Sequence, residues 1–332
     1  MSISTADQCA SEVNVMKGSD FANVVPLAKN WSADLSDAPR LVVFGGAYSN
    51  RHATGAMRAV CERAGVPPKH VICTGDVVAY GAHPQETVDA VRDWGIHVIA
   101  GNCEQQLGVR ADSCACGFGA DTACDVLSRG WYAYADASLN DDARRWMRAL
   151  PDAATFTFGG RRARVIHGGM SATSRFLFAS DTAPIKDELQ QTDADIILAG
   201  HCGIPFMHRE GDRCWVNPGV IGMPANDGTP DGWYSVLEVG PGSAALVCTL
   251  HRLVYDAGGA ADAIARAGYA DPYARALTSG RWPSEDILPE AERSRGGVAI
   301  GEEQWSLEVG STAECVKSVA PPRMADSEGL II

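Results

Sequence analysis

The sequence predicts an α/β fold built on parallel strands, because short apolar strands alternate with helices and polar motifs follow the strand ends. The first strands are expected at Arg40–Phe44, His70–Cys73 and His97–Ala100, separated by helices at residues 52–65 and 84–95. The second of these helices begins at a proline and ends at a glycine, which are typical helix boundaries. Because ligands in such sheets gather at the carboxyl ends of strands, we expect a site there.

The second half of the chain predicts a further sheet that packs on the first. Residues 105–150 have the pattern of loops and helices, and the pattern then changes to strands. Gly159-Gly160 joins two of these strands and suits a tight hairpin turn. One or two closing helices are expected at residues 256–280. The strands of this half are expected at residues 154–158, 161–167, 193–201, 212–217, 233–239 and 244–255.

Three regions are predicted along the chain. Residues 1–38 carry little periodic pattern and are expected to be a partly disordered leader. Residues 39–280 are expected to form the main domain. Residues 281–332 are rich in Pro, Glu, Ser and Gly, so we expect a partly disordered C-terminal extension.

The composition, with 46% apolar and 21% charged residues, is typical of a globular protein. A membrane-spanning helix is not expected, because no run reaches about 18 apolar residues. The N-terminus lacks the basic and apolar regions of a secretory signal, so we expect a cytoplasmic protein. The net charge of -13 disfavours wrapping by nucleic acid but not a small-molecule substrate held at a metal. The oligomeric state is left open.

The eleven cysteines are spread along the chain, so we expect free thiols in a reducing compartment. Cys114, Cys116 and Cys124 form the densest group, which could bind a soft metal or form a redox pair. A C-x-C pair without a matching second pair is a weak signal. The favoured interpretation is a loop with free thiols.

Polar clusters rich in glycine follow the predicted strands. Taken singly, an aspartate after glycine is more often a turn residue, and a histidine before glycine is more often a hydrogen-bonded loop residue. Together they offer carboxylate, amide and imidazole ligands, which suit Mn, Fe or Zn. Four protein ligands leave open the coordination positions that catalysis needs. The clusters are Gly75-Asp76, Gly101-Asn102-Cys103-Glu104, His167-Gly168-Gly169, His201-Cys202-Gly203 and Asn217-Pro218-Gly219.

The order of these clusters resembles that of the calcineurin-like metallophosphoesterase superfamily, whose motifs run D-x-H, G-D, G-N-H-[DE], H-G and G-H-x-H. The segments GDVVAYGAHP and VNPGVIGMP are also similar to family segments, closest to the small bacterial phosphodiesterase-like branch. The resemblance covers roughly residues 40–280. It implies a two-sheet β-sandwich flanked by helices, the four-layer metallophosphoesterase fold. It also implies that one metal is held by Asp76, Asn102, His167 and His201.

Three departures from the family pattern fall on the other metal. The first motif places Gly46 where the family has aspartate and Tyr48 where it has histidine, and Gly203 replaces the last histidine. In the family these positions are the private ligands of the second ion. We therefore expect a site for one metal, or one in which other groups rebuild the lost half.

Several side chains are candidates for that rebuilding or for catalysis. Cys202 lies inside the last motif, although a free cysteine is more often a small buried hydrophobe. His52 and Tyr48 lie close to the first motif. Cys103 replaces the family's catalytic histidine, which removes an obvious general acid. The candidate catalytic residues are Cys103, His52 and Tyr48, and Cys202 is a further candidate metal ligand.

Three functions remain open. The first is a metal-dependent hydrolase of a phosphoester or related small polar substrate. The second is a mononuclear iron or manganese enzyme of another class, such as a lyase or an oxygen-using enzyme. The third is a non-catalytic metal-binding protein on the same fold. The hydrolase is favoured, with one divalent ion per chain (Mn, Fe or Zn).

Overall fold

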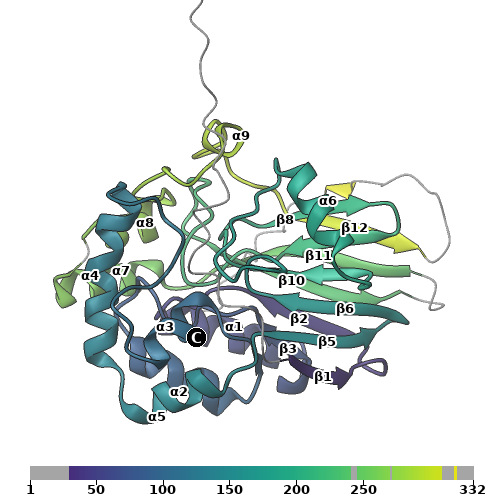
Figure 1. Ribbon diagram of the computed structural model, residues 1–332, viewed down its shortest axis with the longest axis horizontal. Helices are drawn as coiled ribbons and strands as arrows, with labels where there is room; N and C mark the ends of the chain where they lie inside the picture. The colour runs from purple at the N-terminus through teal and green to yellow at the C-terminus, as the bar shows by residue number, and fades with distance from the viewer. Residues whose placement is uncertain (1–29, 241–244, 270, 309–317, 320–332) are drawn as a thin grey trace, which may run out of the picture.

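Two mixed β-sheets lie face to face, and helices cover their outer faces (Figure 1). The computed structural model describes residues 30–240, 245–269, 271–308 and 318–319. One sheet has seven strands in the order β13-β12-β11-β10-β2-β3-β4, and the other has six in the order β1-β5-β6-β7-β9-β8. The predicted α/β class and two-sheet sandwich are confirmed.

Each sheet contains three neighbouring parallel strands, which lie at one end of the first sheet and in the middle of the second. In the first sheet β2 and β4 flank β3 in parallel, and in the second β6 and β9 flank β7 in parallel. The first sheet contains β2 (Arg40–Phe44), β3 (Val71–Cys73), β4 (His97–Val98), β10 (Gly232–Val239), β11 (Ala245–Leu253), β12 (Glu303–Glu308) and β13 (Ser318–Val319). The second contains β1 (Asn30–Asp34), β5 (Ala153–Phe158), β6 (Arg161–Ile166), β7 (Ile196–Leu198), β8 (Phe206–Glu210) and β9 (Arg213–Asn217).

Two predicted strands lie in a different sheet from the one expected. The strands β10 and β11 were assigned with the rest of the second half, but β10 pairs antiparallel with β2. The strand β11 then pairs with β10 and β12. That assignment was wrong because an apolar strand pattern specifies burial and not which sheet receives the strand.

Alternating side chains on β2 show how the layers are held together. Leu41 and Val43 face the apolar core between the two sheets, with Phe156 and Ile196 from the opposite sheet. Val42 and Phe44 face the other way, into the core beneath the helices. This period of two is the pattern of a strand buried on both faces.

Helices form the two outer layers (Figure 1). The helix α6 (Thr182–Gln190) buries Ile185 and Leu189 against the six-stranded sheet. The helix α2 ends at Gly95 in the left-handed conformation, as its sequence predicts. The helices whose buried side chains share the core beside the seven-stranded sheet are α1 (Arg51–Arg63), α2 (Pro84–Trp94), α3 (Asn102–Gly108), α4 (Ala123–Ser138), α5 (Asp141–Ala149), α7 (Ala257–Ala267) and α8 (Asp271–Ser279). The short elements η1 (Pro68–His70) and α9 (Glu290–Arg293) lie between larger ones.

Strands also occur outside the predicted 39–280 domain. The strand β1 falls in the predicted leader and pairs in parallel with β5. The strand β12 falls in the predicted extension and pairs with β11. The segments NWSAD and EQWSLE each contain only two apolar residues, which is too few for an alternating pattern to mark a strand. Residues 1–29 and most of the segment after residue 308 lie outside the described part of the chain.

The predicted hairpin between β5 and β6 is confirmed. The strands pair antiparallel, and Gly159 and Gly160 have φ of 54° and 72°. Positive φ angles at both central residues are characteristic of the type I′ turn, whose twist matches that of the two paired strands. Within the described residues, no helix is long and apolar enough to cross a membrane.

Candidate metal centre

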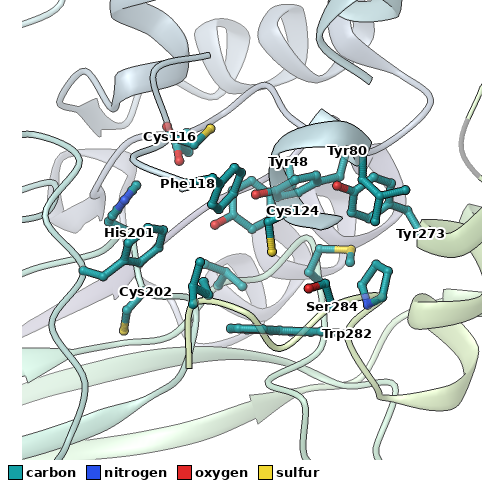
Figure 2. Close-up of a pocket in the computed structure, with 18 residues that line it drawn as sticks. Tyr48, Tyr80, Cys116, Phe118, Cys124, His201, Cys202, Tyr273, Trp282 and Ser284 are labelled. Atoms are coloured by element: carbon teal, nitrogen blue, oxygen red, sulfur yellow. The ribbon is translucent and has the colours of Figure 1, made fainter. Parts of the chain in front are cut away.

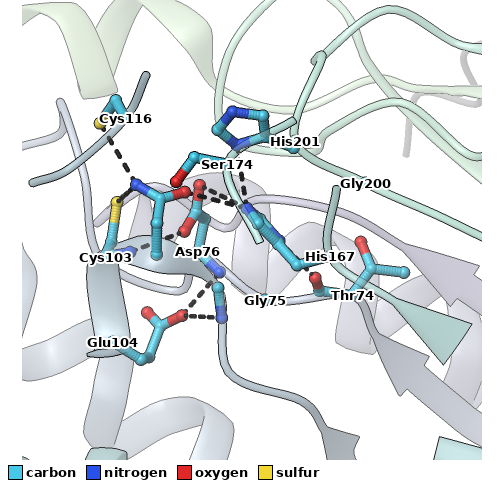
Figure 3. A network of polar contacts seen from close by, with 12 residues as sticks. Thr74, Gly75, Asp76, Cys103, Glu104, Cys116, His167, Ser174, Gly200 and His201 are labelled. Carbon is cyan, nitrogen blue, oxygen red and sulfur yellow. Dashed lines mark hydrogen bonds and ion pairs between the residues drawn. The ribbon is translucent and has the colours of Figure 1, made fainter. Parts of the chain in front are cut away.

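Four polar side chains from the two sheets meet where parallel strands end (Figure 3). Asp76 follows β3 and Asn102 follows β4, whereas His167 follows β6 and His201 follows β7. All four side chains are buried. The carboxyl ends of parallel strands meet at one edge of a sheet, which explains why residues distant in sequence converge here.

His167 lies at the centre of the group. Its Nε2 atom is 3.2 Å from Asp76 Oδ2 and 3.2 Å from Asn102 Oδ1. The same atom is 3.1 Å from Nδ1 of His201. Within the described residues, Asp76, His167 and His201 are the group of acidic, histidine or cysteine side chains whose ligand atoms lie within 4.8 Å of one another.

Hydrogen bonds from the outer atoms of His167 and Asn102 orient these side chains so that their acceptor atoms face the centre of the group. Nδ1 of His167 donates a hydrogen bond to the carbonyl oxygen of Thr74 at 2.7 Å. Because Nδ1 carries the proton, the lone pair of the neutral imidazole is on Nε2. Nδ2 of Asn102 donates to the carbonyl oxygen of Cys114 at 2.9 Å, so the amide oxygen faces the group. The acceptor atoms of His167 and Asn102 therefore face the carboxylate of Asp76, and such an arrangement requires a proton or a cation.

The pKa values of the two histidines are shifted in opposite directions. Burial lowers the pKa of His167, but the carboxylate of Asp76 outweighs it and raises that pKa. Burial, followed by repulsion from His167, lowers the pKa of His201 to about 3. His201 is thus neutral near pH 7, the form in which imidazole binds a metal.

The backbone around these side chains is strained and crowded. Asp76 and His201 have φ of 58° and 63°, in the left-handed region that side chains other than glycine seldom adopt. Gly75 has φ of 101°, and a Cβ atom there would lie 2.5 Å from the backbone nitrogen of Gly101. The close approach of the two loops therefore requires glycine.

Glu104 joins the two loops that carry Asp76 and Asn102. Its carboxylate accepts hydrogen bonds from the backbone nitrogens of Asp76 at 2.7 Å, Gly101 at 2.9 Å and Val78 at 3.2 Å. Burial, with the nearby charge of Asp76, raises its pKa to about 7. Sequence reasoning gave this residue no role, although an acidic residue in the first turn of a helix is a known capping signal.

Aromatic rings fill the places of the side chains missing from the family pattern. A Cβ atom on Gly46 would lie 2.5 Å from Cε1 and Cζ of the Tyr48 ring. A Cβ atom on Gly203 would lie 3.2 Å from Cζ2 of Trp282. The Tyr48 ring therefore covers the position from which an aspartate at residue 46 would extend.

The other candidate residues lie around this centre. Cys103 is buried, its backbone nitrogen donates to Asp76 Oδ1 at 3.2 Å, and burial raises the pKa of its thiol. Cys202 Sγ accepts a hydrogen bond from Asn217 at 3.0 Å, and Figure 2 shows it directed away from His201. His52 Nδ1 lies 3.4 Å from Asp256 Oδ2, and His52 is not part of the pocket lining.

Two cysteines differ from the prediction of free thiols. Cys114 and Cys116 are joined by a disulfide, so the prediction is wrong for this pair, whereas Cys124 is free. Two cysteines separated by one residue can approach closely when the intervening backbone bends, and Ala115 has a positive φ of 48°. The loop lies against Asn102, because Nδ2 of Asn102 is 3.3 Å from Cys116 Sγ.

A pocket that is partly open to solvent lies beside this centre (Figure 2). Asp76 and His201 line one end, and most of the remaining lining is aromatic or aliphatic. Phe118, Phe176 and Trp282 contribute to it, and sequence reasoning identified none of them. Aromatic residues at such positions look like ordinary core residues in a sequence.

One family model matches more than half of this chain. Residues 46–241 match the model of the calcineurin-like phosphoesterase superfamily domain. An uncharacterised protein of Methanocaldococcus jannaschii, MJ0912, is 22% identical over 215 residues, which is 60% of this chain and 82% of that protein.

Two solved structures are similar in fold. A metallophosphoesterase from Sphaerobacter thermophilus has a TM-score of 0.56 and 21% identity, and hypothetical protein PH1004 from Pyrococcus horikoshii has a TM-score of 0.62 and 16% identity. Each match covers 73% of this chain and 99% of the other.

Proposed function

Because the chain belongs to the calcineurin-like phosphoesterase superfamily, we propose that it is a hydrolase that uses one divalent metal ion. The ion would be held by Asp76, Asn102, His167 and His201. The observation that supports this proposal is that Asp76 Oδ2, Asn102 Oδ1 and His201 Nδ1 all lie 3.1 to 3.2 Å from His167 Nε2. Two nitrogen and two oxygen ligands suit Mn, Fe or Zn.

A single ion is proposed because the Tyr48 ring covers the position beside Gly46. An ion held in the remaining half-site would polarise an oxygen of the substrate and lower the pKa of a water molecule. The family's reaction is hydrolysis of a phosphoester, and we propose a phosphoester or a related small polar ester as the substrate.

Tyr48 is proposed to contact the substrate directly. Burial, followed by the charge of Asp76, raises the pKa of its phenol well above the usual value. The phenol therefore keeps its proton near pH 7 and can donate a hydrogen bond to a substrate oxygen. Cys103 also keeps its proton, since burial raises its pKa, and we assign it no nucleophilic role.

Metal content and hydrolysis together test the proposal. Protein purified without added metal or chelator should contain about one Mn, Fe or Zn ion per chain and should hydrolyse bis(4-nitrophenyl) phosphate. His201→Ala should lower metal affinity by at least about 100-fold and abolish turnover. His208→Ala, a histidine on β8 outside the pocket lining, is the matched control and should keep both. A fully metallated His201→Ala protein, or unchanged hydrolysis by it, would contradict the proposal.

The same set of ligands would also serve a mononuclear iron or manganese enzyme of another class. The observation that favours this second candidate is again the Tyr48 ring, which occupies the space of a side chain on residue 46, where the family has a ligand of the second ion. If the metallated protein fails to hydrolyse aryl phosphodiesters but consumes dioxygen in the presence of a reductant, the second candidate replaces the first.

A further inference from the structure

The pocket beside the candidate metal centre has an aromatic wall that begins at a proposed ligand. The Phe176 ring lies 4.2 Å from the His201 ring, at an angle of 33°. The Phe118 ring stacks on Phe176 at 6.0 Å. Apolar surface therefore begins next to the reacting end of the pocket rather than at a distant rim.

Trp282 forms another wall, and its position is fixed. Its Nε1 donates to the carbonyl oxygen of Pro224 at 2.7 Å, and its backbone nitrogen donates to Asn226 Oδ1 at 2.8 Å. Figure 2 shows Trp282 and Phe118 on opposite sides of the pocket. A flat apolar group placed between the rings of Trp282 and Phe118 would be removed from water on both faces. Proteins commonly bind aromatic ligands by such contacts with aromatic side chains.

The charge of the lining excludes a large class of substrates. None of the 18 residues that line the pocket is lysine or arginine, and Asp76 is the one carboxylate among them. A nucleotide polyphosphate or a doubly charged phosphate group deep in this pocket would lose its hydration with no side-chain cation to replace it. One ion at the metal centre can compensate about one negative charge on the reacting group.

We propose that this pocket binds the aromatic or branched apolar group of an ester that carries at most one negative charge. The proposal rests on the proposed function, because it places the reacting group of that ester at Asp76 and His201. It adds the substrate class, and it assigns Phe118 and Trp282 as residues that determine specificity.

Protection of Cys124 from alkylation tests the proposal without a measurement of turnover. Cys124 lines the pocket and is the free cysteine with partial exposure among those in the described part of the chain. The full-length protein is treated with iodoacetamide, and the Cys124 peptide is quantified by mass spectrometry. Diphenyl phosphate and dimethyl phosphate are compared because each carries one negative charge, and pyrophosphate serves as the multiply charged probe.

Diphenyl phosphate should protect Cys124 at a concentration at least roughly tenfold lower than dimethyl phosphate, because its rings leave water. Trp282→Leu and Phe118→Leu should each reduce that preference. Trp305→Leu is the matched control, since Trp305 is also partly buried but packs against the core between the sheets, and it should keep the preference. Two variants on different walls are used so that loss of folding in one does not decide the result.

Equal protection by the two diesters, or stronger protection by pyrophosphate, would overturn the proposal. The measurement is repeated after treatment with a chelator, and the preference for the diphenyl ester should persist. If the protein binds no metal but diphenyl phosphate still protects Cys124 preferentially, the proposed metal-dependent hydrolase is wrong and the inference about the apolar pocket is supported. If metal binds and diesters are hydrolysed without aryl preference, the proposed function stands and this inference fails.

Discussion

A side chain on Gly46 would meet the Tyr48 ring, and this contact can be measured as a coupling energy. The φ of Gly46 is not positive, so alanine there would be opposed by contact with the ring and not by backbone strain. With the new Cβ atom 2.5 Å from two ring atoms, Gly46→Ala should cost about 2 kcal/mol, a typical value for overpacking. Tyr48→Ala removes a buried ring and should cost about 3 kcal/mol.

The double variant should be less destabilised than the sum of the single variants. Without the ring the added methyl group loses its three nearest contacts, so the pair should cost about 3 kcal/mol instead of about 5 kcal/mol. Urea unfolding of the four proteins gives the coupling energy. Gly55→Ala is the control, because a Cβ atom on this α1 glycine meets nothing within 4 Å and should stabilise the helix by up to about 1 kcal/mol. Additivity within about 0.5 kcal/mol would refute the claim that the Tyr48 ring occupies the space beside Gly46.

Three further predictions concern the metal centre. Glu104→Ala should weaken metal binding by about 10- to 100-fold, measured by chelator competition, because the two ligand loops lose their shared acceptor; unchanged affinity would contradict that role. Gly75→Ala should destabilise the protein by more than about 3 kcal/mol in thermal unfolding, whereas Gly95→Ala, with a similar positive φ but open space around it, should cost only about 1 kcal/mol. Gly46→Asp combined with Tyr48→His should raise the metal content above one ion per chain, and an unchanged content would show that the family's second site cannot be restored by these two residues.

The local pattern of the chain predicts most elements that position the site. The strands β2, β3 and β4 follow from short apolar runs, and the hairpin after β5 follows from a Gly-Gly pair. The sheet that receives β10 does not follow, because its apolar alternation fits either sheet. The strands β1 and β12 were missed because each contains only two apolar residues, which is too weak a burial pattern.

Some residues of the candidate metal centre can also be predicted from the sequence, and others cannot. Asp76 and His201 stand at strand ends next to glycine, so topology alone brings them to one edge of the fold. That the Tyr48 ring lies above Gly46 is a packing result that depends on positive φ angles within the loop. Trp282 follows α8, and no local feature of its sequence indicates that it faces a pocket.

The pairing of β10 with β2 has a consequence for how the chain is made. Ser235 on β10 bonds to Val43 on β2, 192 residues earlier. As the chain leaves the ribosome, one edge of β2 stays unpaired through the synthesis of nearly all of the six-stranded sheet. An exposed apolar strand edge is a site of aggregation, and strand pairing over such a distance is slow. Chains that stop before residue 232 should accumulate as aggregates rather than as a smaller folded unit, since the two sheets share one apolar core.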